Sequence, residues 1–287
     1  MNAKYWHSTE NKNVQCDLCP HNCKIAPGKT GICKVRENRD GELFSLNYFV
    51  ASSMAVDPIE KKPLHNFYPG SKILSFGTYG CNFSCQFCQN YSISKEFSPS
   101  RLENPNLTKE SFLKYLEELD TKDLNDFVGV AYTYSEPTVW AETILELGPI
   151  VRQRGLKNVM VTNGFINPEP LGNFLEFTDA FNIDLKSFDD NFYRKYSAGR
   201  LQPVLDTIKS ASKKAHVELT NLIIPTLNDT DENFIKLRDW VAKEIGPETP
   251  VHLTHYYPTY KMTLPPTPHE TVLYARKILK EKLVNVY

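Results

Sequence analysis

The sequence contains no long hydrophobic run and no excess of charge of either sign. No stretch reaches the roughly 18 apolar residues that a transmembrane helix requires, so we expect no membrane span. The 33 Lys and Arg residues balance the 34 Asp and Glu residues, so nothing marks the chain as a general nucleic-acid binder. Internal repeats and low-complexity runs are also missing. The polar start, residues 1–15, does not resemble a signal peptide.

The composition is that of a folded protein with an unusual use of cysteine. Hydrophobic residues make up 41% and aromatic residues 12% of the 287 positions, enough for a sizeable core. The seven cysteines fall into a group of four and a group of three. We expect a cytoplasmic protein, because clustered cysteines without a secretory leader indicate metal or cluster ligation in a reducing compartment rather than disulfides.

Strand and helix patterns alternate from residue 72 onward. Strands are predicted at 72–78, 127–134, 159–162, 181–185, 217–224 and 251–255, and helices at 108–120, 137–154, 168–177, 202–214, 231–245 and 267–282. Six βα units imply a parallel sheet covered by helices. A complete (β/α)8 barrel typically needs about 250 residues, so a partial (β/α)6 TIM-like barrel fits better. We expect a Cys-rich segment with a metal site and a hairpin at 42–50 over residues 1–70, and the barrel over 71–287.

Barrels of this kind carry their chemistry at the carboxyl ends of the strands. The polar residues at those positions are Cys81 to Cys88, Ser135 and Glu136, Thr162 and Asn163, Asp184 and Lys186, Thr226 to Asp229, and His255. Asn163 and Gly164 equally suit a plain turn.

The first of these strand ends carries three cysteines in one loop. Cys81, Cys85 and Cys88 have the spacing C-x3-C-x2-C. A [4Fe–4S] cluster usually takes four thiolates, so three leave one iron open to a small molecule. S-adenosylmethionine (SAM) can chelate such an iron, and one electron then cleaves its sulfonium to give a 5′-deoxyadenosyl radical. The alternatives are a structural zinc loop with a fourth ligand elsewhere, or three core cysteines.

These features resemble the radical SAM superfamily and, within it, the branch of the pyruvate formate-lyase activating enzymes. The nearest likeness is to the radical SAM enzyme of the AmmeMemoRadiSam system, which also includes Memo-like and AMMECR1-like proteins. The segments that carry the likeness are 16–23 (CDLCPHNC), 56–64 (VDPIEKKPL), 81–90 (CNFSCQFCQN) and 257–262 (YPTYKM).

The resemblance implies a set of SAM-binding residues, which are Phe87, Gln89, Ser135, Glu136, Asp184, Lys186 and His255. Phe87 would pack on the adenine and Glu136 would accept from the methionine ammonium. Lys186 would pair with the SAM carboxylate and Asp184 with a polar group. The chain departs from the family where Tyr134 and Ser135 replace two glycines and where His255 stands in place of a frequent arginine.

Simpler roles exist for the same side chains. Glu136 could be a charge at a helix N-terminus, favoured by the helix dipole. Asp184 and Lys186 could be a paired or solvated strand end, and His255 a strand-end histidine with an ordinary partner. The segment 57–62 is expected to be a solvated charged loop.

The N-terminal group is Cys16, Cys19, Cys23 and Cys33. Four thiolates complete a tetrahedral zinc site or hold an auxiliary iron–sulfur cluster, and either would stabilise a segment with little core. Zinc is slightly favoured, free thiols or a disulfide are a third alternative, and His21 is not expected to be a ligand.

The resulting hypothesis is a radical SAM oxidoreductase that removes a hydrogen atom from a substrate, which could be a protein, as for glycyl-radical activases. A flavodoxin- or ferredoxin-like donor would supply the electron, and the likeness suggests a functional link to Memo-like and AMMECR1-like proteins. The rival is a non-catalytic iron–sulfur electron carrier or zinc-stabilised interaction module, whose metal would have a full set of protein ligands.

Overall fold

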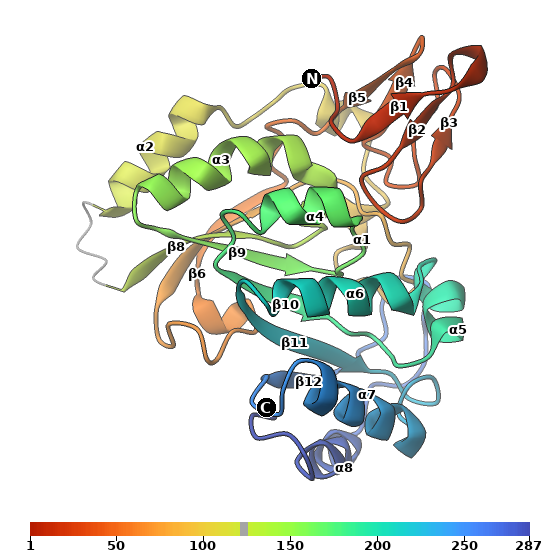
Figure 1. Ribbon diagram of the computed structural model, residues 1–287, viewed down its shortest axis with the longest axis vertical. Helices are drawn as coiled ribbons and strands as arrows, with labels where there is room; N and C mark the ends of the chain where they lie inside the picture. The colour runs from red at the N-terminus through yellow and green to blue at the C-terminus, as the bar shows by residue number, and fades with distance from the viewer. Residues whose placement is uncertain (121–125) are drawn as a thin grey trace.

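A curled sheet of seven strands forms the centre of the protein in the computed structural model, which describes residues 1–120 and 126–287 (Figure 1). The order across the sheet is β12-β11-β10-β9-β8-β7-β6. The strands are β6 (Ser53–Pro58), β7 (Lys72–Gly77), β8 (Phe127–Tyr132), β9 (Lys157–Thr162), β10 (Ala180–Asp184), β11 (His216–Ile223) and β12 (Val251–His255). Strands β7 to β12 are parallel and β6 pairs antiparallel with β7. The prediction of a partial (β/α)6 barrel is confirmed.

Helices follow the parallel strands and cover the outside of the sheet. The longer ones are α2 (Lys109–Asp120), α3 (Ala141–Gln153), α4 (Pro168–Phe174), α6 (Leu201–Ala211), α7 (Asp231–Glu244) and α8 (His269–Leu279). Figure 1 shows α3, α4 and α6 side by side over one face of the sheet. Thr108 caps the start of α2, because its hydroxyl accepts from the N–H of Ser111 at 3.1 Å. No helix among the described residues is long and apolar enough to cross a membrane.

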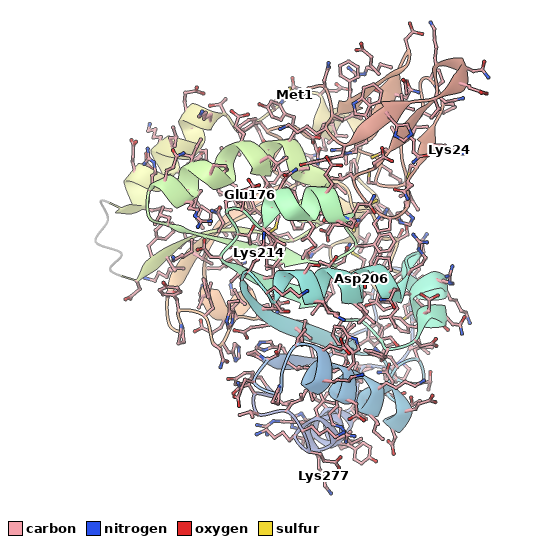
Figure 2. All side chains as sticks on the ribbon, in the orientation of Figure 1. Met1, Lys24, Glu176, Asp206, Lys214 and Lys277 are labelled. Atoms are coloured by element: carbon pink, nitrogen blue, oxygen red, sulfur yellow. The ribbon has the colours of Figure 1, made fainter. Side chains whose placement is uncertain are left out.

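Several short elements connect these units. They are α1 (Tyr91–Ser94), α5 (Asp190–Phe192), the 3₁₀ turns η1 (Glu10–Lys12), η2 (Ile59–Lys61), η3 (Pro99–Leu102) and η4 (Pro137–Trp140), and the π-helical turn η5 (Tyr193–Ser197). The N-terminal segment adds a sheet of β1 (Trp6–Ser8), β2 (Val14–Cys16) and β3 (Lys24–Ile25). Figure 2 shows Lys24 on this segment and Lys277 on α8 toward opposite ends of the molecule.

Two local predictions are wrong. The hairpin consists of β4 (Arg36–Arg39) and β5 (Glu42–Ser45), so it begins before and ends before the predicted 42–50. Its turn is formed by Asp40 and Gly41, which both have positive φ, as a tight hairpin turn requires. The segment 57–62 is not a solvated loop, because Asp57 lies within β6 and the side chains of Asp57 and Lys62 are buried.

The chain after β6 closes the inside of the barrel at the N-terminal ends of the strands. Ile59 and Leu64 pack with the inward-facing Ile73, Val159 and Ala180. Two further contacts fix this closing segment to the sheet: the Asn182 side chain donates to the Pro63 carbonyl at 2.8 Å, and the N–H groups of His65 and Asn66 donate to Glu218. The division at residue 70 stays a prediction, although β6 belongs to the same sheet as the barrel strands.

A buried ion pair fixes the N-terminal segment to the barrel. Arg36 of β4 contacts Glu142 of α3, and both side chains are 1% exposed. Arg36 also donates to the Lys4 carbonyl at 2.8 Å, and the Lys4 N–H donates to Glu142 at 2.8 Å. Because each charge satisfies the other out of contact with water, removal of one partner leaves an uncompensated buried charge.

We therefore predict that Glu142→Gln lowers the free energy of unfolding by about 3 kcal/mol, as loss of one partner of a buried pair typically does. Denaturant unfolding under anaerobic conditions measures the change. Arg39→Met is the matched control, because the Arg39–Glu37 pair lies in the same hairpin with Arg39 57% exposed, and exposed pairs contribute about 1 kcal/mol or less. Equal effects of the two substitutions would contradict the prediction.

Candidate functional site

A cavity of about 400 Å³ opens inside the barrel at the carboxyl ends of the strands. The three cysteines of the 81–88 loop and all seven predicted SAM contacts, which are Phe87, Gln89, Ser135, Glu136, Asp184, Lys186 and His255, line this one cavity. Thr226 to Asp229, also singled out at a strand end, do not: the Thr226 N–H donates to Asp229 at 2.8 Å within a local turn. The size suits a small-molecule ligand, since such pockets typically measure about 300–1,000 Å³.

The cysteine loop is attached to the π-helical turn η5 and to α1. The N–H groups of Ser84 and Gln86 donate to the carbonyls of Ser197 and Tyr196 at 2.8 and 2.9 Å. The Gly80 N–H donates to the carbonyl of Ile93, in the turn of α1, at 2.9 Å. Gly80 has φ +93°, and a Cβ there would lie 2.8 Å from the carbonyl oxygen of Cys33. Glycine is required because the two cysteine segments meet at this point.

Burial raises the pKa of the Cys81 and Cys85 thiols, while Lys95 beside Cys81 and Lys186 beside Cys85 act in the opposite direction. Thiolates in this position therefore need positive charge, which iron would supply. Within residues 1–120 and 126–287, no three His, Cys, Asp or Glu side chains converge on the position of a single metal ion. Three thiolates from one loop that line one cavity are a donor set that suits a cubane cluster, which takes each thiolate on a different iron.

Glu136 is buried and caps the turn η4. One carboxylate oxygen accepts from the Thr138 N–H at 3.0 Å and the Thr162 hydroxyl at 2.6 Å, and the other accepts from the Asn163 N–H at 2.9 Å. Glu136 therefore also has the simpler role of a negative charge at a helix N-terminus. An ionised carboxylate has about four acceptor positions, so three donors leave room for one more from the cavity.

Tyr134, one of the two residues that stand in place of the family's glycines, keeps a glycine-like backbone. Tyr134 has φ +68° in spite of its side chain, and the Asn90 side chain donates to its carbonyl at 2.6 Å. The buried Ser135 hydroxyl has no hydrogen-bond partner among the described residues, yet it lines the cavity. A buried hydroxyl without a partner is costly, so this atom is suited to a polar ligand.

Asp184 and Lys186 face each other at the end of β10. The Lys186 ammonium lies 2.8 Å from an Asp184 carboxylate oxygen and 5.8 Å from the centre of the Phe87 ring. Burial alone would lower the pKa of Lys186, but Asp184 and Cys85 raise it above its usual value, so the side chain is charged. Asp184 and Lys186 therefore form an ion pair at the strand end and are also part of the cavity wall.

The remaining predicted contacts differ in how far they are buried, with Phe87 only 4% exposed. Gln89 is exposed, and Phe87 packs against Phe192 with ring centres 5.9 Å apart. His255 stacks on His269, with ring nitrogens 3.4 Å apart. The strand-end histidine therefore has an ordinary partner and also borders the cavity.

Beside the cysteines, sequence reasoning missed Lys95 and left Asn163 open as a strand-end site residue or a plain turn. The Asn163 side chain lies 3.7 Å from the Cys81 sulfur and donates to Asn82 at 2.8 Å, so Asn163 is more than a turn residue. The buried Lys95 donates to the carbonyls of Cys81 at 2.6 Å and Ile32 at 3.1 Å. No sequence motif identifies Lys95 as a site residue. Asn163 could be identified from its position directly after the strand β9.

The N-terminal cysteines lie next to this loop. Cys16, Cys19 and Cys33 are buried, Cys23 is partly buried, and all four thiols are free. Burial, together with the neighbouring Cys16 and Cys23, raises the pKa of Cys33 to about 11. His21 bonds the Asn82 carbonyl at 2.8 Å, so it is engaged with the 81–88 loop. These four thiols are among the side chains that do not converge on one metal position in the described residues, so a metal site at this segment stays a prediction.

Comparison with known proteins agrees with this geometry. The model of the family described as "Radical SAM superfamily" matches residues 76–241, more than half of the chain. The uncharacterized protein MJ0808 of Methanocaldococcus jannaschii is 40% identical over 99% of this chain and 84% of its own length. The pyruvate formate-lyase-activating enzyme of Clostridium pasteurianum is 25% identical over 66% of this chain and 76% of its own.

A solved structure shares the fold. The radical SAM methyltransferase from Sphaerobacter thermophilus superposes with a TM-score of 0.57 over 77% of this chain and 67% of its own, at 13% sequence identity. The sequence matches, the partial barrel and the three-cysteine loop after its first parallel strand lead to one conclusion: this chain belongs to the radical SAM superfamily.

Proposed function

We propose that the protein is an enzyme that cleaves SAM reductively and removes a hydrogen atom from a substrate. The observation that carries the proposal is the convergence of Cys81, Cys85 and Cys88 with the seven expected SAM contacts in one cavity. A non-catalytic electron carrier would have no use for an unpartnered Ser135 hydroxyl and a charged Lys186 beside its cluster.

The three cysteines would hold a [4Fe–4S] cluster, which, when bound with SAM, supplies the electron that breaks the sulfonium bond. The chain itself orients SAM. Glu136 accepts from the methionine ammonium, Ser135 contributes a hydroxyl, and Lys186 pairs with the carboxylate while Asp184 holds the Lys186 ammonium in place. Phe87 packs on the adenine, and Gln89 and His255 border the opening.

The substrate and partners are inferred from the resemblance to activating enzymes. A flavodoxin- or ferredoxin-like protein would donate the electron, and the substrate would be a protein, as the name of the Clostridium pasteurianum relative indicates for that enzyme. The likeness over residues 16–23 and 56–64 supports a link to Memo-like and AMMECR1-like proteins. Seven free thiols support a reducing, cytoplasmic location.

Anaerobic reconstitution tests the central proposal. With iron, sulfide, SAM and dithionite, the protein is expected to form 5′-deoxyadenosine, and Cys85→Ala is expected to abolish the product because the cluster loses one of three ligands. Ser94→Ala is a matched control, since Ser94 lies 3.3 Å from the Cys88 sulfur without being a proposed ligand. Absence of 5′-deoxyadenosine, together with an EPR signal of the cluster that does not respond to SAM, would contradict the proposal that the protein is a SAM-cleaving enzyme.

The role of Glu136 predicts a pH dependence of SAM binding. Burial raises the pKa of Glu136, although the donors from Asn163 and Thr162 oppose the rise. The carboxylate that attracts the SAM ammonium is therefore lost at a higher pH than for an ordinary glutamate, and affinity should fall on acidification through that pKa. Glu136→Gln keeps an acceptor for the Thr138 N–H but loses the charge.

We expect Glu136→Gln to weaken SAM binding about tenfold, the effect of roughly 1.4 kcal/mol, and to remove this pH dependence. Equilibrium binding of SAM to the unreduced, reconstituted protein at several pH values measures both effects. Glu146→Gln is the control, because Glu146 accepts from Tyr48 outside the cavity. An unchanged pH profile in Glu136→Gln would remove Glu136 from the SAM site.

Zinc at the N-terminal cysteines is a separate proposal. Cys81→Ala protein, purified with and without oxygen, is expected to retain about one zinc per chain and no iron, as a closed four-thiolate site would. Elemental analysis provides the measurement, and Cys19→Ala in the same background should lose the zinc. Retained iron in Cys81→Ala would instead indicate an auxiliary cluster.

A further inference from the structure

The segment 57–62 (DPIEKK) has no role in the SAM site, yet it reaches the same cavity. Asp57 pairs with Ile73 near the beginning of β7, whereas the cysteine loop follows the end of that strand. Lys61 and Lys62 nevertheless line the cavity together with Cys81, Cys85 and Cys88. The cavity therefore has a cysteine end and, toward the opposite end of β7, a lysine end. The two lysines follow β6, which Figure 1 shows at the edge of the sheet.

Two ammonium groups share one carboxylate at the lysine end. Lys62 lies 2.8 Å from one oxygen of Asp57, and Lys61 lies 3.2 Å from the other. The Tyr134 hydroxyl donates to the same carboxylate at 2.8 Å, and the Lys62 ammonium lies 4.7 Å from the centre of the Tyr134 ring. Two positive charges against one negative charge leave this group with one excess positive charge.

The donors of the two lysines are only partly used. An ammonium has three N–H donors, and among the described residues Asp57 is the only hydrogen-bond acceptor for either lysine. Lys62 is 2% exposed, so water contributes little to it, while Lys61 is 66% exposed. A buried ammonium with a single acceptor is costly unless another negative group approaches it.

The other charged side chains of the cavity do not neutralise this excess. Lys186 is paired with Asp184, and Glu136 is engaged by the donors from Thr138, Thr162 and Asn163. If SAM binds between Glu136 and Lys186, its ammonium and carboxylate cancel, and its sulfonium adds one positive charge at that end. The lysine end keeps its own excess positive charge, since among the described residues Asp57 is the only carboxylate within ion-pair distance of either lysine.

We propose that Asp57, Lys61, Lys62 and Tyr134 form a binding site for an anionic group, a carboxylate or a phosphate, carried by the part of the substrate that enters the cavity. Lys62 provides a fixed charge, held by Asp57 and the Tyr134 ring, and Lys61 closes on the anion from the exposed side. The anchored group would place the rest of the substrate between the lysine end and the SAM site. The assignment of the anion to a substrate rests on the proposed function, but the binding of the anion does not.

Calorimetric titration of the reconstituted, unreduced protein tests the site without turnover. The probes are succinate and inorganic phosphate, each with and without saturating SAM, and succinamide is the neutral control. We expect succinate or phosphate to bind in the presence of SAM and succinamide not to bind; the comparison of the two anions identifies the preferred group. Lys62→Met should weaken binding of the preferred anion about tenfold or more, and Lys61→Met should weaken it by a smaller factor because its charge is exposed.

Three controls make the result decisive. Lys72→Met removes an exposed lysine beside β6 that does not line the cavity, and should bind the anion as the unchanged protein does. Lys62→Arg keeps the positive charge and should bind the anion much better than Lys62→Met does. A role of Lys62 in packing alone would not predict this difference. A cluster EPR signal that still responds to SAM would show that the Lys62→Met variant has folded. If the Lys62→Met variant does not fold, the Lys61→Met variant provides the test.

Anion binding that is equal in the unchanged protein and both Met variants, or that is absent from all of them, would overturn the proposal. Competition between succinate and SAM would also overturn it, since the anion would then occupy the Lys186 site. A protein that binds the anion through Lys62 but forms no 5′-deoxyadenosine would retain this site while the proposed SAM chemistry failed.

Discussion

The parallel register of six strands is the constraint on which the site depends. Because β7 to β12 all run in one direction, the residues that follow them meet at a single rim, although Cys81 and His255 are separated by most of the barrel in sequence. The helices on the outside bury the other face of the sheet and leave the inside to smaller side chains such as Ala131, Val159 and Val161. The space that they leave becomes the cavity, closed at the N-terminal ends by residues 59–67.

The N-terminal segment completes the rim rather than lying apart from it. Lys95 bonds carbonyls of both cysteine segments, and Gly80 lies against the carbonyl of Cys33 at a distance that no side chain would allow. The buried Arg36–Glu142 pair holds the same segment to α3. A metal at the four N-terminal cysteines would therefore stabilise the wall behind Cys81, because loss of order there removes the Cys33 backbone packed against Gly80 and the Ile32 carbonyl that accepts from Lys95.

The strand ends could be predicted from sequence because hydrophobic runs followed by polar residues mark them directly. Cys81, Glu136, Asp184 and His255 are each found where that pattern placed them. Lys61 and Lys62 could not be placed in this way. They follow an antiparallel edge strand, β6, whose sequence resembles a loop because it ends in charged residues. Its residues Met54 and Val56 face outward, and only the register with β7 shows that Asp57 faces inward.

Lys95 and Tyr134 show a second limit. Lys95 acts through backbone carbonyls of residues distant in sequence, and such contacts leave no pattern of residue types. Tyr134 takes a positive φ that propensity assigns to glycine or asparagine, and its backbone is held there by Asn90 and by the packing of its ring against Gly77. The substitution of this glycine is therefore not a weakened version of the family motif. The tyrosine keeps the backbone conformation and adds a hydroxyl that reaches Asp57, so a single residue joins the wall of the proposed SAM site to the lysine end.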